Sequence, residues 1–141
     1  MSTLLEVQTA LADQVADVLN DVTIQVAPML VWQPTPPCID IYPADPFQEQ
    51  QGFGVGRDTV YLSVRGRVNT PDHDGAQELL LSLMDPKAAT SVQQAIESDQ
   101  TLGGAVTQAM ISEGPTNYGI FPDPSGQGAY LGCTWTVRIV L

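Results

Sequence analysis

Basic residues are the scarcest charged class in this chain. Five lysines and arginines stand against 16 aspartates and glutamates in 141 residues, which gives a formal net charge of −11. Proteins that bind phosphate backbones or anionic membrane surfaces carry clustered lysine and arginine. The composition therefore argues against tight nucleic-acid binding and against docking to an anionic membrane.

Long apolar runs are also missing. No run approaches the ~20 residues that a membrane-spanning helix needs, and the start, Met1 to Glu6, lacks the basic and apolar regions of a secretory signal. We therefore expect no membrane partner and a soluble protein that is made in a cytoplasm.

Cysteine and histidine are too few for a metal site. Cys38 and Cys133 lie in apolar, strand-like surroundings, and His73 is the single histidine. We expect two buried free thiols, with a disulfide as the less typical alternative in a reducing compartment. Asp72, His73 and Asp74 point in different directions on a helix, so they indicate a solvated helix start. No metal or cofactor is expected.

Known catalytic motifs are absent. The alternating glycines of residues 52–56 are not followed by Gly-Lys-Ser/Thr, and a strand rather than a helix comes next. Ser125 does not lie in a Gly-x-Ser-x-Gly elbow. Asp40 and Asp45 could form a carboxylate pair, but carboxylates at turns and strand edges are more common. The sequence therefore predicts no catalytic residue and no enzyme.

Helical periodicity appears in three segments. Residues 3–20 form an amphipathic pattern whose polar side is a stripe of acidic residues without basic partners. A second helix is predicted from Thr70-Pro71 to Asp85-Pro86, with Leu81 pointing away from the buried face toward a possible partner. A short third helix, 91–98, has Thr90 and Gln93 as a capping box. The acidic stripe consists of Glu6, Asp13, Asp17 and Asp21.

Strand patterns fill most of the remaining chain. Residues 22–33 are interrupted at Pro28, which indicates an edge or bulged strand. The other predicted strands are 38–43, 59–68, 104–112, 116–121 and 129–141, and the turn 123–126 joins the last two as a hairpin. Together these elements predict one α+β domain over residues 1–141, a largely antiparallel sheet with two main helices and one short helix packed on it. The expected core contains Leu11, Val15, Val60, Leu62, Val64, Leu79, Leu83, Trp135 and Val137.

A long loop is predicted at residues 44–57. Phe47, Phe53 and Val55 lie in this glycine-rich stretch. Loops of this length in a compact domain are usually functional or disordered. The three apolar side chains indicate either a docking site on a partner or a loop that folds back over its own sheet.

Four stretches of the sequence resemble the tail terminator proteins of long-tailed phages, especially those of actinobacterial hosts. They are Pro37-Cys38-Ile39-Asp40-Ile41-Tyr42-Pro43 before the long loop, Asp99-Gln100-Thr101-Leu102-Gly103-Gly104-Ala105-Val106 after the short helix, Tyr118-Gly119, and Tyr130-Leu131-Gly132-Cys133-Thr134-Trp135-Thr136-Val137 in the last strand. The order of elements is similar as well, so the resemblance extends over nearly the whole chain.

The resemblance implies a structural role in a virion. Tail terminators form a hexameric ring on the last ring of the major tail tube protein, stop tube growth and present a surface to head-completion or connector proteins. Genomic DNA later passes through the ring without specific binding. The family has no catalytic residues to carry over. An acidic channel wall suits this passage because it does not attract phosphate.

Within such a ring, Arg57, Arg65 and Arg67 are the basic residues that could face a neighbour's acidic stripe. The alternative is that these arginines pair within their own subunit. Three other functions remain open: a head-completion, connector or minor tail protein; a small protein-binding domain unrelated to phage; and a hydrolase with an unrecognised site.

Overall fold

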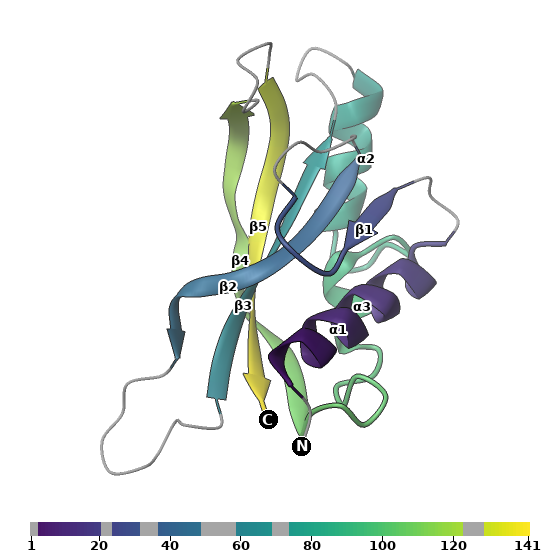
Figure 1. The fold of residues 1–141 in the computed structure, drawn as a ribbon. Coiled ribbons are helices and arrows are strands. Elements are labelled where there is room, and N and C mark those ends of the chain that lie inside the picture. The colour runs from purple at the N-terminus through teal and green to yellow at the C-terminus, as the bar shows by residue number, and fades with distance from the viewer. Residues whose placement is uncertain (1–2, 21–23, 32–36, 49–58, 69–73, 123–128) are drawn as a thin grey trace.

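The computed structural model describes residues 3–20, 24–31, 37–48, 59–68, 74–122 and 129–141. This part of the chain forms one five-stranded sheet with helices on one face (Figure 1). The elements are α1 Leu4–Val18, β1 Gln25–Ala27, β2 Cys38–Gln48, β3 Thr59–Val68, α2 Asp74–Met84, α3 Val92–Glu97, β4 Gln108–Pro122 and β5 Ala129–Val140. The strands lie in the order β1-β2-β3-β5-β4; β1 is parallel to β2, and the other neighbours are antiparallel. The fold is α+β, as predicted.

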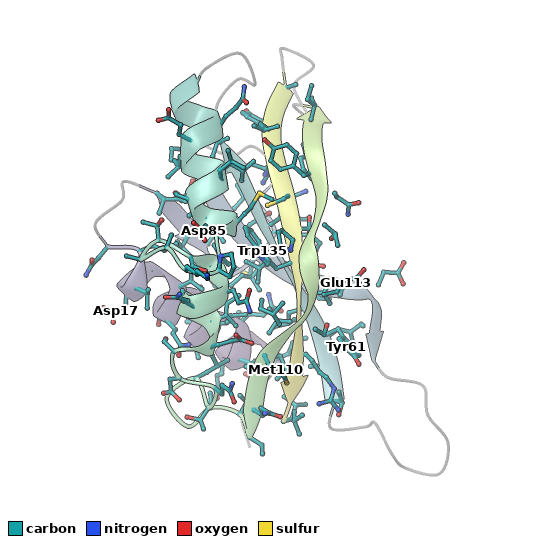
Figure 2. All side chains as sticks on the ribbon, turned by 180° about the vertical axis from the view of Figure 1, so that it is seen from behind. Asp17, Tyr61, Asp85, Met110, Glu113 and Trp135 are labelled. Carbon is teal, nitrogen blue, oxygen red and sulfur yellow. The ribbon has the colours of Figure 1, made fainter. Side chains whose placement is uncertain are left out.

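The core lies between the sheet and the helices. Alternate residues of β3 and β5 point to the same face, and the cross-strand pair of Val64 and Trp135 lies near its centre. Trp135 is 1% exposed and lies between the sheet and the helices (Figure 2). All the predicted core residues are buried except Leu79, which is half-buried and packs against the cluster.

Strand β2 is longer than predicted. The sequence pattern ends a strand at Pro43 and begins a loop at Ala44, but the structure continues β2 to Gln48. A register shift between Pro43 and Gln48 separates two stretches of pairing with β3. The pairing of β1 ends at Asp40, so the following part of β2 has an edge on that side, where prolines are tolerated.

Strand β4 corrects a second prediction. The two strands expected at 104–112 and 116–121 are one strand, β4, and residues 104–107 precede it. Three register shifts between Ile111 and Gly119 interrupt its pairing with β5. Such bulges absorb Gly114 and Pro115 without ending the strand, because extra residues bend away from the partner and the pairing then resumes.

The ends of the helices agree in part. Helix α3 begins at Val92 with Ser91 as its N-cap, whose hydroxyl accepts a hydrogen bond of 3.2 Å from Gln94 N. The predicted cap, Thr90, instead donates to the carbonyl of Ser82, so that prediction was wrong by one residue. The predicted start of the second helix at 70–71 and the turn at 123–126 lie outside the described residues. Pro122 nevertheless pairs with Ala129, so the predicted hairpin is confirmed.

Candidate functional site

The sheet has a polar face on the side away from the helices, here called the outer face. It consists of the alternate strand residues that do not enter the core, among them the cross-strand pairs Asp40 with Arg65 and Ser63 with Thr136. Figure 2 shows Tyr61 and Glu113 on this side of the sheet. Two features of the outer face bear on function: a buried ion cluster and a hollow.

The ion cluster joins Asp40 to two arginines of β3. The carboxylate of Asp40 is fully buried. It accepts hydrogen bonds from Arg65 Nη2 at 2.7 Å, Arg65 Nε at 3.2 Å and Arg67 Nη2 at 3.3 Å. The chain after β1 covers this cluster. Val31 donates its N–H to Asp40 at 3.1 Å, and its carbonyl accepts from Arg67 Nη2 at 2.9 Å. The guanidinium of Arg65 also lies 5.1 Å from the centre of the Tyr42 ring.

In this cluster, two guanidinium groups share the single carboxylate of Asp40. Burial lowers the pKa of Arg67, and the charge of Asp40 only partly opposes this. Burial is also the largest single influence on Arg65 and acts to lower its pKa, but the hydrogen bond and the charge of Asp40, with smaller contributions from Tyr42 and Cys38, together outweigh burial, so the pKa is raised. Arg67 Nε has no hydrogen-bond partner among the described residues. Both arginines therefore stay charged and depend on Asp40 for compensation.

Arg65 and Arg67 pair with Asp40 within their own subunit, which agrees with the alternative stated for these arginines, and their side chains are 17% and 3% exposed. Contact of either arginine with a neighbour's acidic stripe stays a prediction. Arg57 lies outside the described residues. Sequence reasoning missed Asp40 as their partner because the register of β2 against β3 is not set by a short turn.

The hollow lies on the outer face beside the ion cluster and has a volume of about 680 Å³. Strands β3 and β5 form its floor, and residues of β2 and β4 form its sides. Three aromatic rings and two exposed carboxylates, those of Asp45 and Glu113, line it together with hydroxyl groups. The lining residues are Tyr42, Pro43, Ala44, Asp45, Tyr61, Ser63, Ser112, Glu113, Thr116, Asn117, Phe121, Thr134 and Thr136. No local sequence pattern indicates this hollow, because its formation depends on which strands are neighbours in the sheet.

The acidic stripe lies on the other side of the molecule. Glu6, Asp13 and Asp17 are exposed on α1, as the helical pattern predicts, and Asp21 lies outside the described residues. A second hollow, of about 610 Å³, separates α1 from the turn at 98–103. Asp99 in that turn accepts hydrogen bonds from Thr101 Oγ1, Thr101 N and Gly103 N, which hold its pKa below the usual value. These bonds give Asp99 a structural role in the turn.

Exposed apolar side chains occur as two pairs, one after β1 and one in β4. Met29 and Leu30 follow β1 and are 56% and 53% exposed; Tyr118 and Ile120 in β4 are 47% and 64% exposed. Leu81 on α2 is exposed, as expected.

The predicted docking loop is only partly described. Phe47 is half-buried and packs against the core, because β2 carries it along the sheet. For Phe47 this agrees with the second alternative, a segment that folds back over its own sheet. Phe53 and Val55 lie outside the described residues.

The two cysteines were predicted to be buried free thiols. Cys38 and Cys133 are free and fully buried, as predicted. Burial raises the pKa of both thiols, that of Cys133 to about 12.

The described residues contain no cluster of three His, Cys, Asp or Glu side chains suited to a metal ion. Among the described helices, none has the length and apolar character to cross a membrane.

Comparison with known proteins places the chain in no group. The chain matches no family model and no curated protein. Its function therefore has to be argued from its own residues and surfaces.

Proposed function

We propose that this protein is a structural subunit of a tailed-phage virion, a tail terminator that forms a ring on the head-proximal end of the tail tube. The four sequence stretches that resemble tail terminators support this proposal. The structural observation that carries it is the presence of two separate exposed apolar pairs, Met29 with Leu30 after β1 and Tyr118 with Ile120 in β4.

A ring of identical subunits needs two different, complementary surfaces on each subunit. Strands β1 and β4 are the two ends of the strand order, so their outer edges lie on opposite sides of the sheet (Figure 1). Met29 and Leu30 closely follow β1 in the chain, and Tyr118 and Ile120 lie in β4. Contact between the β1 side of one subunit and the β4 side of the next would repeat around a closed ring.

The charge of the subunit makes such apolar contacts necessary. Six subunits of charge −11 would carry about −66 together, so self-repulsion opposes closure of a hexamer. Arg65 and Arg67 already pair with Asp40 within the subunit, so they leave less positive charge to offset this repulsion at a seam. Burial of the two exposed apolar pairs would supply the attraction instead, at about 25 cal/mol per Å² of apolar surface.

The test is assembly in solution and on purified tail tubes. Native mass measurement and electron microscopy should show closed rings of the wild-type protein, free or at tube ends. The variants Met29→Ser with Leu30→Ser, and Tyr118→Ser with Ile120→Ser, should each abolish ring formation and leave the subunit folded. Leu5→Ser is the matched control, since Leu5 is equally exposed but lies on α1.

The phenotype of virions that lack the protein distinguishes a tail terminator from a connector or head-completion protein. Overlong tubes would support the terminator, whereas normal tails detached from heads would indicate a connector or head-completion protein. If no closed ring forms in solution, on tubes or in virions, the terminator proposal fails.

A further inference from the structure

We propose that the outer-face hollow binds an arginine side chain presented by another protein. The proposal does not depend on ring formation, since the hollow lies on the face of the sheet rather than at the two exposed apolar pairs. It rests on three properties of the lining: aromatic rings, carboxylates without an ion pair among the described residues, and hydroxyl groups that are open to a ligand.

The aromatic rings come from three strands. Tyr42 is on β2, Tyr61 on β3 and Phe121 on β4, and all three line the hollow. Guanidinium groups stack on aromatic faces, and the electron-rich face of the ring attracts their charge. The chain already shows one such contact at the margin of the hollow, where Arg65 lies over Tyr42 with 5.1 Å between the guanidinium carbon and the ring centre.

The carboxylates supply negative charge without an internal partner. Asp45 and Glu113 line the hollow, and neither forms an ion pair with any described residue. None of the lining residues is a lysine or an arginine. In a chain of net charge −11, this combination favours a cation and disfavours phosphates and other anions.

Two hydroxyl groups on the floor face the hollow. Ser63 and Thr134 are each only 8% exposed, and neither side chain forms a hydrogen bond with a described residue. Among the described residues, only Arg67 Nε is a fully buried side-chain polar atom without a partner, so the two hydroxyl oxygens are reachable from the hollow. The neighbouring hydroxyl groups of Ser112 and Thr116 differ, since they donate to the carbonyls of Thr136 and Thr134. The floor therefore offers free acceptors to an incoming donor.

Arginine fits this set better than lysine does. A guanidinium group carries five N–H donors in a plane, so it can contact a carboxylate and floor hydroxyls while its face lies on a ring. An ammonium group is a compact, strongly hydrated charge and gains less from ring faces. The volume of about 680 Å³ is also within the usual range for ligand pockets and leaves room for the side chain and part of its backbone.

The experiment is an NMR titration of the full chain with blocked arginine, N-acetyl-arginine amide. Amide signals of Tyr61, Thr116, Thr134 and Thr136 should shift together and saturate. The citrulline analogue has nearly the same shape without the charge and should produce no saturable shift, and the lysine analogue should bind more weakly. Asp45→Asn with Glu113→Gln should weaken arginine binding roughly tenfold, since both ion pairs with the guanidinium group are lost.

Further variants separate a specific site from general attraction to an acidic surface. Phe121→Ala should weaken binding without changing charge, and the matched control Glu78→Gln removes an exposed carboxylate on α2 and should leave binding unchanged. Melting curves establish that each variant is folded. The proposal is overturned if citrulline binds as well as arginine, if a neutral sugar binds in place of arginine, or if shifts spread equally over Asp13 and Asp17 on α1. Failure of ring formation would leave this result unaffected.

Discussion

At the scale of single residues, Asp40 is a buried charged group that depends on several neighbouring groups for compensation. It lies fully buried with two guanidinium groups and one backbone N–H around its carboxylate. A buried ion pair contributes little net stability compared with an apolar replacement, but loss of one partner leaves the other charge uncompensated. Substitution of Asp40 should therefore cost far more stability than substitution of an exposed carboxylate.

Asp40→Asn should lower the free energy of unfolding by about 3–5 kcal/mol, because Arg67 stays buried without a counter-charge. Urea denaturation measures this loss. The control is Asp45→Asn, five residues later on the same strand but exposed, which should change stability by no more than ~0.5 kcal/mol. Equal losses for the two variants would show that the ion cluster has no special role.

At the scale of elements, helix α2 has one face in the core and one in solvent. Leu83 is fully buried and Leu81 is 53% exposed, although they are two residues apart on the same helix. They form a natural pair for measuring how firmly α2 is packed on the sheet.

Leu83→Ala should cost about 2–5 kcal/mol of stability, since it removes buried methyl groups and leaves a cavity. Leu81→Ala should stay within ~0.5 kcal/mol of the wild type. Thermal and denaturant unfolding of both variants measures the difference. A Leu83→Ala protein with an unchanged melting temperature would contradict the observed placement of α2.

Elements with regular patterns were predictable from the sequence. Strand β3 alternates Val60, Leu62 and Val64 with polar residues, and both of its boundaries agree with the structure to within one residue. The lengths of β2 and β4 were not predictable, because their prolines and glycines indicate breaks that bulges accommodate instead. The outer-face hollow and the Asp40 cluster depend on strand order and register, which local pattern does not encode.

At the scale of the whole molecule, negative charge is the dominant property. The ion cluster occupies two of the five basic residues, so fewer cations remain to balance the acidic surface. Self-repulsion of a compact, highly charged chain opposes folding, and dissolved salt screens it.

Stability should therefore rise with ionic strength. Raising sodium chloride from about 10 to about 100 mM shortens the Debye length from ~30 to ~10 Å, so the melting temperature should increase by a few degrees. Asp13→Asn with Asp17→Asn should raise stability at low salt and reduce the salt dependence, because both residues are exposed on α1 without a described cation nearby. A melting temperature that falls over this range would show that attractive ion pairs outweigh repulsion.

The strand order also sets how the chain reaches its native state. Strands β2 and β3 form one antiparallel pair of near neighbours in sequence, and β4 and β5 form another, whereas β3 and β5 join the two pairs through contacts such as Val64 with Trp135, 71 positions apart. Each pair closes a short loop, but their union must overcome the entropy of closing a long one. We therefore expect the docking of the two hairpins, with α2 and α3 enclosed between them in sequence, to be the slow step of folding.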